Sequence, residues 1–190
     1  MVTLFVRIAD DRVGAVIGTA GSTRLEIERR TGTQLSIDAE AGEVTVTAPD
    51  TADPLGALQA RDIVVAIGRG FSPARAFRLL NDDTYLGLID IKSVTGRREK
   101  DALWRVRSRL IGTDGKARKR IEELSGCSMS VYRNTVALIG KEPELERGTR
   151  AVELLLRGSE HSVVFRMLAR LRREEALIEA TSAPEVADGD

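Results

Sequence analysis

The sequence of 190 residues contains only one cysteine, Cys127, and one histidine, His161. A zinc site needs about four Cys, His or acidic ligands at set spacings, so the sequence predicts no metal site. A single cysteine also excludes the disulfide framework that is typical of small secreted domains. No apolar run approaches the ~18–20 residues of a membrane span, and the first residues lack the features of a signal peptide. We therefore expect a soluble, cytoplasmic protein without metal or cofactor and without a membrane partner.

Motifs for catalysis are also missing. A P-loop requires Gly-x-x-x-x-Gly-Lys followed by Ser or Thr. In this chain Gly115-Lys116 is followed by Ala117, and Leu110 stands where the first glycine belongs. With no other catalytic constellation in the sequence, we expect that the protein is not an enzyme.

Aromatic residues make up only 4% of the chain, too few for a surface that binds single strands by stacking alone. The one tryptophan, Trp104, is expected in the core, on the helix that precedes Gly112, and contact with RNA is the alternative. Cys127 is interpreted as a small core residue of a strand. His161 follows a Gly-Ser break, so we expect it to start a helix or to pack rather than to act as a base.

Charge is balanced overall but uneven along the chain. Lys and Arg number 29, and Asp and Glu also number 29. Residues 1–70 carry 7 basic and 10 acidic residues, whereas residues 97–140 carry 11 basic and 5 acidic ones. A basic block in an otherwise neutral chain indicates either a local anion-binding face or a solvated helix surface.

The chain contains an internal repeat. A shift of 94 positions aligns two stretches without a gap, pairing glycines with glycines and apolar residues with apolar residues. The aligned pairs include Ile17 with Ile111, Gly18 with Gly112, Gly21 with Gly115, Arg24 with Arg118, Ile27 with Ile121, and Gly32 with Gly126. The sequence therefore predicts a duplicated module.

Each copy is predicted to follow the order strand, helix, helix, strand, strand, helix. The expected elements follow from the spacing of the apolar residues and from the Gly or Pro residues at the ends of each segment. In the first copy they are a strand at 2–8, helices at 10–17 and 22–31, strands at 34–37 and 43–47, and a helix ending near 67. In the second copy they are 85–91, 98–111, 116–124, 128–132, 135–139 and 143–156. Asp10 or Asp11 is expected to cap the first helix.

A Gly-x-x-Gly turn joins the first two helices of each copy. Glycine permits positive φ and lets a foreign backbone approach without a Cβ in the way. Free N–H groups and the dipole at the start of the second helix favour a phosphate. A helix–turn–helix that needs glycine only for packing is the alternative, but the turn occurs twice in the same context.

These residues resemble the type I KH domain, whose Ile-Gly-x-x-Gly hallmark reads Ile17–Gly21 in the first copy and Ile111–Gly115 in the second. The order of elements after the turn, two strands and a helix, is similar to type I rather than type II. The resemblance implies an α+β fold of two tandem KH modules, in which each turn clamps about four nucleotides of single-stranded RNA. It also implies an apolar groove for the bases. In the second copy its lining is expected to be Ile111, Ile121, Leu124, Met129 and Val131.

The resemblance and the basic block together give the expected RNA-binding residues. In the second copy they are Arg109, Ile111, Gly112, Thr113, Asp114, Gly115, Lys116, Arg118, Lys119, Met129 and Arg133. Weaker RNA binding is expected at Gly18, Thr19, Ala20, Gly21 and Arg24. The first turn contains no Lys or Arg, and its hairpin loop carries acidic residues that repel phosphate. We therefore expect the second module to dominate the affinity for RNA.

The second half also resembles a narrower family, the archaeal two-KH-domain assembly proteins of the small ribosomal subunit, counterparts of the eukaryotic partner of Nob-one. The stretch RLIGTDGKARKRIEELSGCSMSVYRNTVALIG and the later LLRGSEHSVVF carry this resemblance. It implies binding to the 3′ region of 16S rRNA or its precursor. It further implies contact with the rRNA maturation endonuclease and with the alpha subunit of initiation factor two.

The expected domain organisation is a first KH module at 1–70, a linker helix at 71–82, a second KH module at 83–158, a C-terminal helix at 159–180 and a disordered tail at 181–190. Two other functions stay open at this point. The chain could be a KH-type adaptor that acts through protein contacts, or a KH regulator that binds other transcripts. The acidic first module favours the adaptor, whereas the basic block favours RNA binding.

Overall fold

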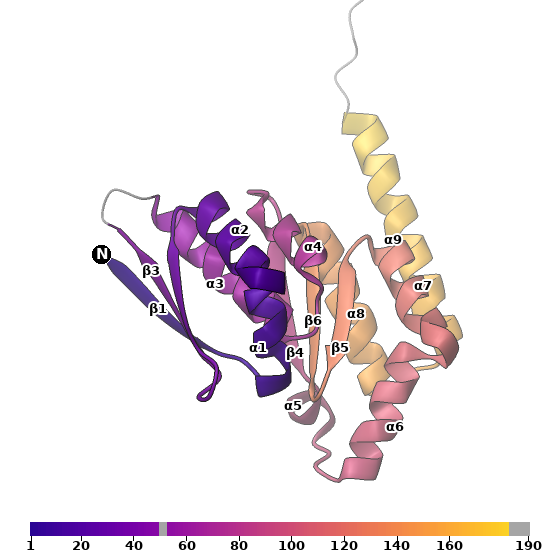
Figure 1. Ribbon diagram of the computed structural model, residues 1–190. Helices are drawn as coiled ribbons and strands as arrows, with labels where there is room; N and C mark the ends of the chain where they lie inside the picture. Colours follow the sequence, from indigo (N-terminus) through magenta and orange to yellow (C-terminus); the bar gives the residue numbers. More distant parts are fainter. Residues whose placement is uncertain (50–52, 183–190) are drawn as a thin grey trace, which may run out of the picture.

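Two α+β modules lie side by side, joined by a short helical linker, in the computed structural model, which describes residues 1–49 and 53–182 (Figure 1). The first module and the linker contain β1 (Val2–Arg7), α1 (Asp10–Ile17), η1 (Thr19–Gly21), α2 (Ser22–Thr31), β2 (Gln34–Asp38), β3 (Glu43–Ala48), α3 (Pro54–Gly68), α4 (Pro73–Ala76) and η2 (Phe77–Leu80). The second module and the C-terminal helix contain β4 (Tyr85–Asp90), α5 (Ile91–Thr95), α6 (Lys100–Ile111), η3 (Thr113–Gly115), α7 (Lys116–Ser125), β5 (Ser128–Tyr132), β6 (Thr135–Gly140), α8 (Glu142–Leu156) and α9 (His161–Ser182).

Each module has one three-stranded antiparallel sheet with the same topology. The strand orders are β1-β3-β2 and β4-β6-β5, so the last strand of each copy lies in the middle. The registers also correspond, since Val6 pairs with Val44 in the first sheet and Ile89 with Val136 in the second. This duplicated arrangement confirms the expected α+β fold of two tandem modules.

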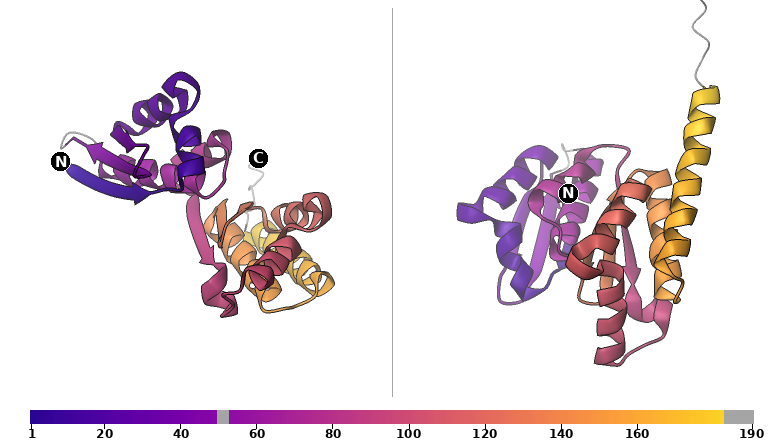
Figure 2. Two further views of the ribbon diagram at one scale, coloured as in Figure 1. Left: turned by 60° about the horizontal axis from the view of Figure 1, so that its bottom comes forward. Right: turned by 90° about the vertical axis from the view of Figure 1, so that its right-hand side faces the viewer.

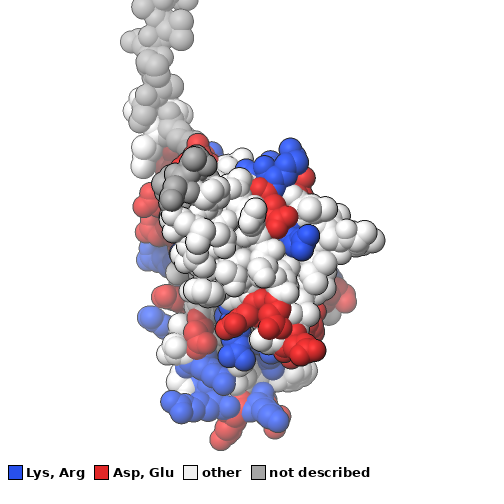
Figure 3. All heavy atoms as spheres, turned by 60° about the vertical axis from the view of Figure 1, so that its left-hand side comes forward, with Lys and Arg blue, Asp and Glu red and all other residues white. Residues whose placement is uncertain are grey.

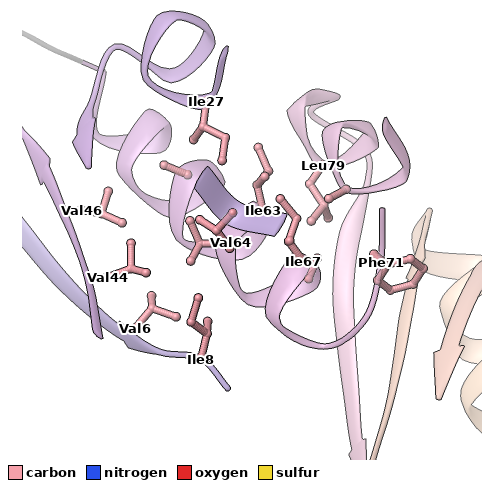
Figure 4. Packing of buried hydrophobic residues seen from close by; sticks show 14 of the residues in the cluster. Val6, Ile8, Ile27, Val44, Val46, Ile63, Val64, Ile67, Phe71 and Leu79 are labelled. Carbon is pink, nitrogen blue, oxygen red and sulfur yellow. The ribbon is translucent and has the colours of Figure 1, made fainter. Parts of the chain in front are cut away.

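The helices of the first module cover one face of its sheet (Figure 4). Val44 and Val46 of the middle strand point to this face and are fully buried, as the period of two along a strand requires. They pack in one cluster with Ile63, Val64 and Ile67 of α3. The opposite face of the sheet remains open, and Phe5 on it is 73% exposed.

The second sheet is buried on both faces. Val136 and Leu138 of β6 belong to the core beneath the helices of the second module. The alternate residues, Ala137 and Ile139, are also fully buried but belong to the core of the first module. That core includes Phe71, Ala76 and Leu79 of the linker, and Figure 4 shows Phe71 at its edge nearest the strands of the second sheet. The linker therefore covers the face of the second sheet that corresponds to the open face of the first sheet.

Polar contacts fix the modules to each other beside this apolar interface. The Tyr132 hydroxyl donates to the Asp11 carboxylate at 2.6 Å, and Arg133 forms an ion pair with the same carboxylate at 2.8 Å. Together, the Tyr132 hydrogen bond and the Arg133 charge hold the pKa of the Asp11 carboxyl below its ordinary value. Arg12 donates to the carbonyls of Ile67 and Phe71, which ties α1 to the linker.

Helix α9 packs on the second module before it extends away from the body (Figures 1 and 2). Val164 and Leu168 on its inner face are fully buried in the second core. Arg172 donates to the carbonyl of Glu123 in α7 at 2.8 Å. His161, the first residue of α9, makes a 2.9 Å hydrogen bond with the carbonyl of Arg109, in agreement with its expected place at a helix start.

The structure differs from the sequence-based elements in three places. The helix expected at 98–111 is shorter, and a separate helix, α5, precedes it. Ala9 rather than an aspartate is the N-cap of α1, because Asp10 and Asp11 already lie in its first turn. Helix α9 continues to Ser182, into the expected tail, and residues 183–190 lie outside the described residues. Among residues 1–49 and 53–182, none of the helices combines the length and hydrophobicity that crossing a bilayer requires.

Candidate nucleic-acid interface

The two Gly-x-x-Gly turns have the same backbone conformation. The φ and ψ angles are 75° and 174° at Gly18, and 72° and 173° at Gly112. Gly21 and Gly115 both end the turn in the left-handed region, with φ of 80° and 73°. The duplication seen in the sequence is therefore preserved to the level of individual backbone angles.

The first glycine of each turn is required by packing. A Cβ added to Gly18 would lie 2.6 Å from the backbone nitrogen of Thr23, and one added to Gly112 would lie 2.7 Å from Cβ of Ala117. Both distances are shorter than van der Waals contact, so the turn closes tightly on the helix that follows. This glycine serves the helix–turn–helix packing.

The second glycine of each turn faces open space. No protein atom would lie within 4 Å of a Cβ on Gly21, and only Nη2 of Arg118, at 3.9 Å, would lie near a Cβ on Gly115. Gly21 and Gly115 are also the N-caps of α2 and α7, and neither helix start has a side-chain cap. The turn thus presents a helix start without a side-chain cap, with its positive end, to a space that a ligand backbone can enter.

Several basic side chains follow the second turn. Lys116 and Lys119 are exposed and form no ion pair among the described residues. Nε of Arg118 is buried without a hydrogen-bond partner there. Because none of these three side chains forms an ion pair in the described part of the chain, the N-terminal half of α7 is suited to bind phosphate groups. Asp114 lies exposed within the same turn and opposes this charge.

The first turn lacks such cations. Arg24 lies 3.9 Å from Glu28, one turn further along α2. The guanidinium of Arg12 is occupied by two backbone carbonyls. Thr19 and Ala20 between the glycines carry no charge. A broad surface without charged side chains also extends across the view of the first module in Figure 3.

The structure corrects part of the expected groove lining. Ile121 and Met129 are fully buried, and Leu124 is 8% exposed, so these side chains support the groove from the core rather than line it. Ile111, at 36% exposure, and the half-buried Val131 are the expected lining residues that reach solvent. The accessible apolar surface beside the turn is therefore smaller than the sequence suggested.

Two of the expected RNA-binding arginines have other partners. Arg109 donates to the carbonyls of Leu155, Gly158 and Ser159, so its guanidinium fixes the loop between α8 and α9. Arg133 is paired with Asp11 of the first module. Its backbone carbonyl accepts a 3.1 Å hydrogen bond from Arg107, which joins α6 to the hairpin.

The sequence reasoning missed one acidic residue on the helix after the turn of each module. The carboxylate of Glu122 accepts the backbone N–H of Met129 at 2.7 Å, and Glu28 accepts that of Leu35 at 2.8 Å. In both modules this hydrogen bond connects the helix after the turn to the edge strand. The alignment of Glu28 with Glu122 in the repeat was the signal that could have identified the pair.

Two sequence families match the chain. Residues 85–173 match the family described as "Eukaryotic type KH-domain (KH-domain type I)", and residues 3–60 match the KH domain family. The KH domain-containing protein MJ0443 of Methanocaldococcus jannaschii is 42% identical over 170 residues, which cover 89% of this chain and 74% of that protein.

Solved structures of similar proteins have the same fold. Dim2p from Pyrococcus horikoshii OT3 is 48% identical, with a TM-score of 0.84 over 90% of this chain and 99% of that one. The a/eIF2alpha–aDim2p–rRNA complex from the same organism contains a chain that is 48% identical, with a TM-score of 0.86 over 91% of this chain and 95% of that one. The protein APE0754 from Aeropyrum pernix is 37% identical, with a TM-score of 0.90 over 95% of both chains.

Proposed function

The chain belongs to the archaeal family of two-KH-domain small-subunit assembly proteins, counterparts of the eukaryotic partner of Nob-one, and we propose that it is a non-catalytic RNA-binding assembly factor. Its ligand is single-stranded RNA from the 3′ region of 16S rRNA or its precursor. The second KH module supplies most of the affinity. We place this activity in the cytoplasm, where the small subunit assembles.

The observation that carries this proposal is the difference between the two turns. Both turns have the backbone of a KH clamp, but only Gly115 is followed by a helix start with unpaired cations, among them Lys116 and Lys119. A KH turn holds RNA by its sugar–phosphate backbone, so affinity follows the charge at the turn. At the first turn the corresponding positions of α2 are Ser22 and Leu25, which are uncharged.

Two protein partners belong to the same proposal. The aDim2p relative forms a complex with a/eIF2alpha and rRNA. We propose the alpha subunit of initiation factor two and the rRNA maturation endonuclease as partners of this chain as well. Two features favour protein contacts of the first module over contacts with phosphate: Phe5 is 73% exposed on the open sheet face, and Figure 3 shows a broad uncharged surface.

A titration of the full chain with a short single-stranded RNA tests the proposal. The RNA matches the 3′ end of archaeal 16S rRNA, a scrambled RNA of equal length is the control, and both are measured at two salt concentrations. We expect tight binding that is weaker on the scramble and weakens with salt. The slope of log K against log salt is expected near −0.7 for each phosphate contact on a single strand.

Equal affinity for the scrambled RNA would favour a KH regulator of other transcripts over an assembly factor. Absence of binding to either RNA would refute the RNA-binding function. In that case the adaptor function, through the uncharged face of the first module, becomes the better account.

A further inference from the structure

Trp104 lies on the surface, contrary to its expected place in the core. The side chain is 64% exposed, and its indole N–H has no hydrogen-bond partner among the described residues. The buried face of α6 is formed instead by Leu103 and Leu110. A tryptophan exposes a large apolar area at a cost in hydration, so the only one in the chain, on a surface helix, indicates a ligand contact.

Trp104 lies on the same face of α6 as Ile111, the last residue before the Gly112–Gly115 turn. Trp104 and Ile111 are seven positions apart, which is about two helical turns, so the two side chains lie nearly in line. The separation along the axis is about 10 Å at about 1.5 Å per residue. That length spans no more than about three nucleotides of one strand at ~3.4 Å or more for each. A strand clamped at the turn therefore reaches Trp104 with little additional length.

Unpaired cations accompany the indole. Arg97, Arg98, Lys100 and Arg105 are exposed, and none of these side chains forms an ion pair or hydrogen bond among the described residues. The acidic side chains on this segment are Glu99 and Asp101, so the segment keeps a positive balance. The N-terminal turns of α6 project beyond the rest of the second module (Figures 1 and 2). Basic side chains gather at the corresponding lower end of the molecule in Figure 3.

The first module shows that this feature is not needed for the fold. Helix α1 has 8 residues and α6 has 12, and the repeat aligns Trp104 with Asp10, the first residue of α1. Asp10 and the neighbouring Asp11 are acidic, which is the opposite of what an RNA strand requires. The additional turn, the tryptophan and the cations therefore occur together in the module whose Gly-x-x-Gly turn is also basic.

We propose that Trp104 stacks on a base of the RNA strand outside the nucleotides that the Gly112–Gly115 turn clamps, with the cations of α6 holding the adjoining phosphates. The contact extends the binding path from the turn along the exposed face of α6. It rests on the proposed RNA-binding function and adds a subsite to it. Stacking on an aromatic side chain is tolerant of sequence, so this subsite contributes affinity rather than base identity.

Substitution of Trp104 tests the subsite through RNA length. Three RNAs are compared. The short RNA has about four nucleotides, the length that one KH turn clamps, and the two longer RNAs extend it at the 5′ or the 3′ end. One stacked base contributes ~1–3 kcal/mol, so we expect Trp104→Ala to weaken binding of one extended RNA by about 5- to 140-fold. The short RNA is expected to bind Trp104→Ala and wild type equally, and Trp104→Phe is expected to retain most of the affinity. Phe5→Ala, which removes another exposed aromatic side chain, is the matched control and should bind as wild type.

The intrinsic fluorescence of the wild-type chain gives a second readout, because Trp104 is its only tryptophan. We expect the extended RNA, but not the short one, to quench and shift this emission. Equal affinity of wild type and Trp104→Ala for every extended RNA, with no change in emission, would overturn the subsite while leaving the RNA-binding function in place. Absence of binding to all RNAs by the wild-type chain would instead overturn the function on which the subsite rests.

Discussion

The two modules share a backbone but differ in what surrounds it. Their Gly-x-x-Gly turns have nearly equal φ and ψ angles, and their sheets have the same strand order. The second turn, however, is followed by unpaired cations, whereas the sheet of the first module exposes a face on which Phe5 lies. Both copies have the same turn geometry, but the unpaired cations follow only the second turn among the described residues. A fold match therefore identifies the turn in both copies, and the proposal that the second copy binds phosphate rests on the local charges.

The two sheets also differ in whether their outer face is free for protein contacts. In the second module the linker covers the outer sheet face, and Ala137 and Ile139 on that face are fully buried. The corresponding positions of β3 are Thr45 and Thr47, which remain half-buried. The second module is thus fixed within the chain through its outer sheet face, which leaves its turn side open, whereas the first module keeps a free sheet face.

The largest effect on stability is expected at the interface between the modules. Phe71 is 1% exposed, in a cluster that joins the first core to the second sheet. Phe71→Ala is expected to lower the free energy of unfolding by about 3–5 kcal/mol, because it removes a buried ring and leaves a cavity. Denaturant unfolding measures the change. Phe5→Ala, at an exposed aromatic position, should alter stability little, and an equal loss for both variants would contradict the assignment of the interface.

A smaller effect is expected at the polar contact between the modules. Tyr132 and Arg133 hold the pKa of Asp11 below its ordinary value in the folded state. The contact therefore stabilises the folded chain above the unfolded-state pKa and loses this contribution as pH falls through the folded-state pKa. Asp11→Asn should reduce stability at neutral pH, and the difference from wild type should shrink in acid. A difference that grows as the pH falls would show that the charged Asp11 carboxylate does not stabilise the folded chain.

The smallest effect is expected inside the turns. Ala20 and Asp114 occupy the same left-handed position, with φ of 51° and 53°. Aspartate tolerates this region better than alanine, so Ala20→Asp should stabilise the chain and Asp114→Ala should destabilise it, each by ~1 kcal/mol or less. Thermal unfolding of the two variants checks the opposite signs. Changes of equal sign would contradict the equivalence of the two turns.

Local features of the sequence were sufficient to predict most of the fold. The repeat with an offset of 94 aligned Gly18 with Gly112 and Gly21 with Gly115, and the structure confirms the same turn at both sites. Periodicity identified the strands and most helices, because each element buries one face.

Contacts between distant segments were not predictable in this way. The pairing of Arg133 with Asp11 joins residues 122 positions apart, and no local pattern encodes it. Trp104 was placed in the core on the basis of its hydrophobicity, but Leu103 and Leu110 form the buried face of α6 instead. Hydrophobicity alone does not distinguish a core residue from an exposed ligand contact, since both use the same side chains.

The central claim, that the second turn supplies most of the RNA affinity, is tested most directly by one set of four variants. Gly21→Asp and Gly115→Asp add a negative charge in the open space of each turn, and Gly21→Asn and Gly115→Asn are nearly isosteric neutral controls that also tolerate positive φ. RNA affinity is measured for all four. We predict that Gly115→Asp weakens binding by roughly 10- to 150-fold relative to Gly115→Asn, because the added carboxylate repels the phosphate by an amount similar to the ~1.5–3 kcal/mol of a charged hydrogen bond. Gly21→Asp should bind as Gly21→Asn does, and equal losses at both turns would contradict the account.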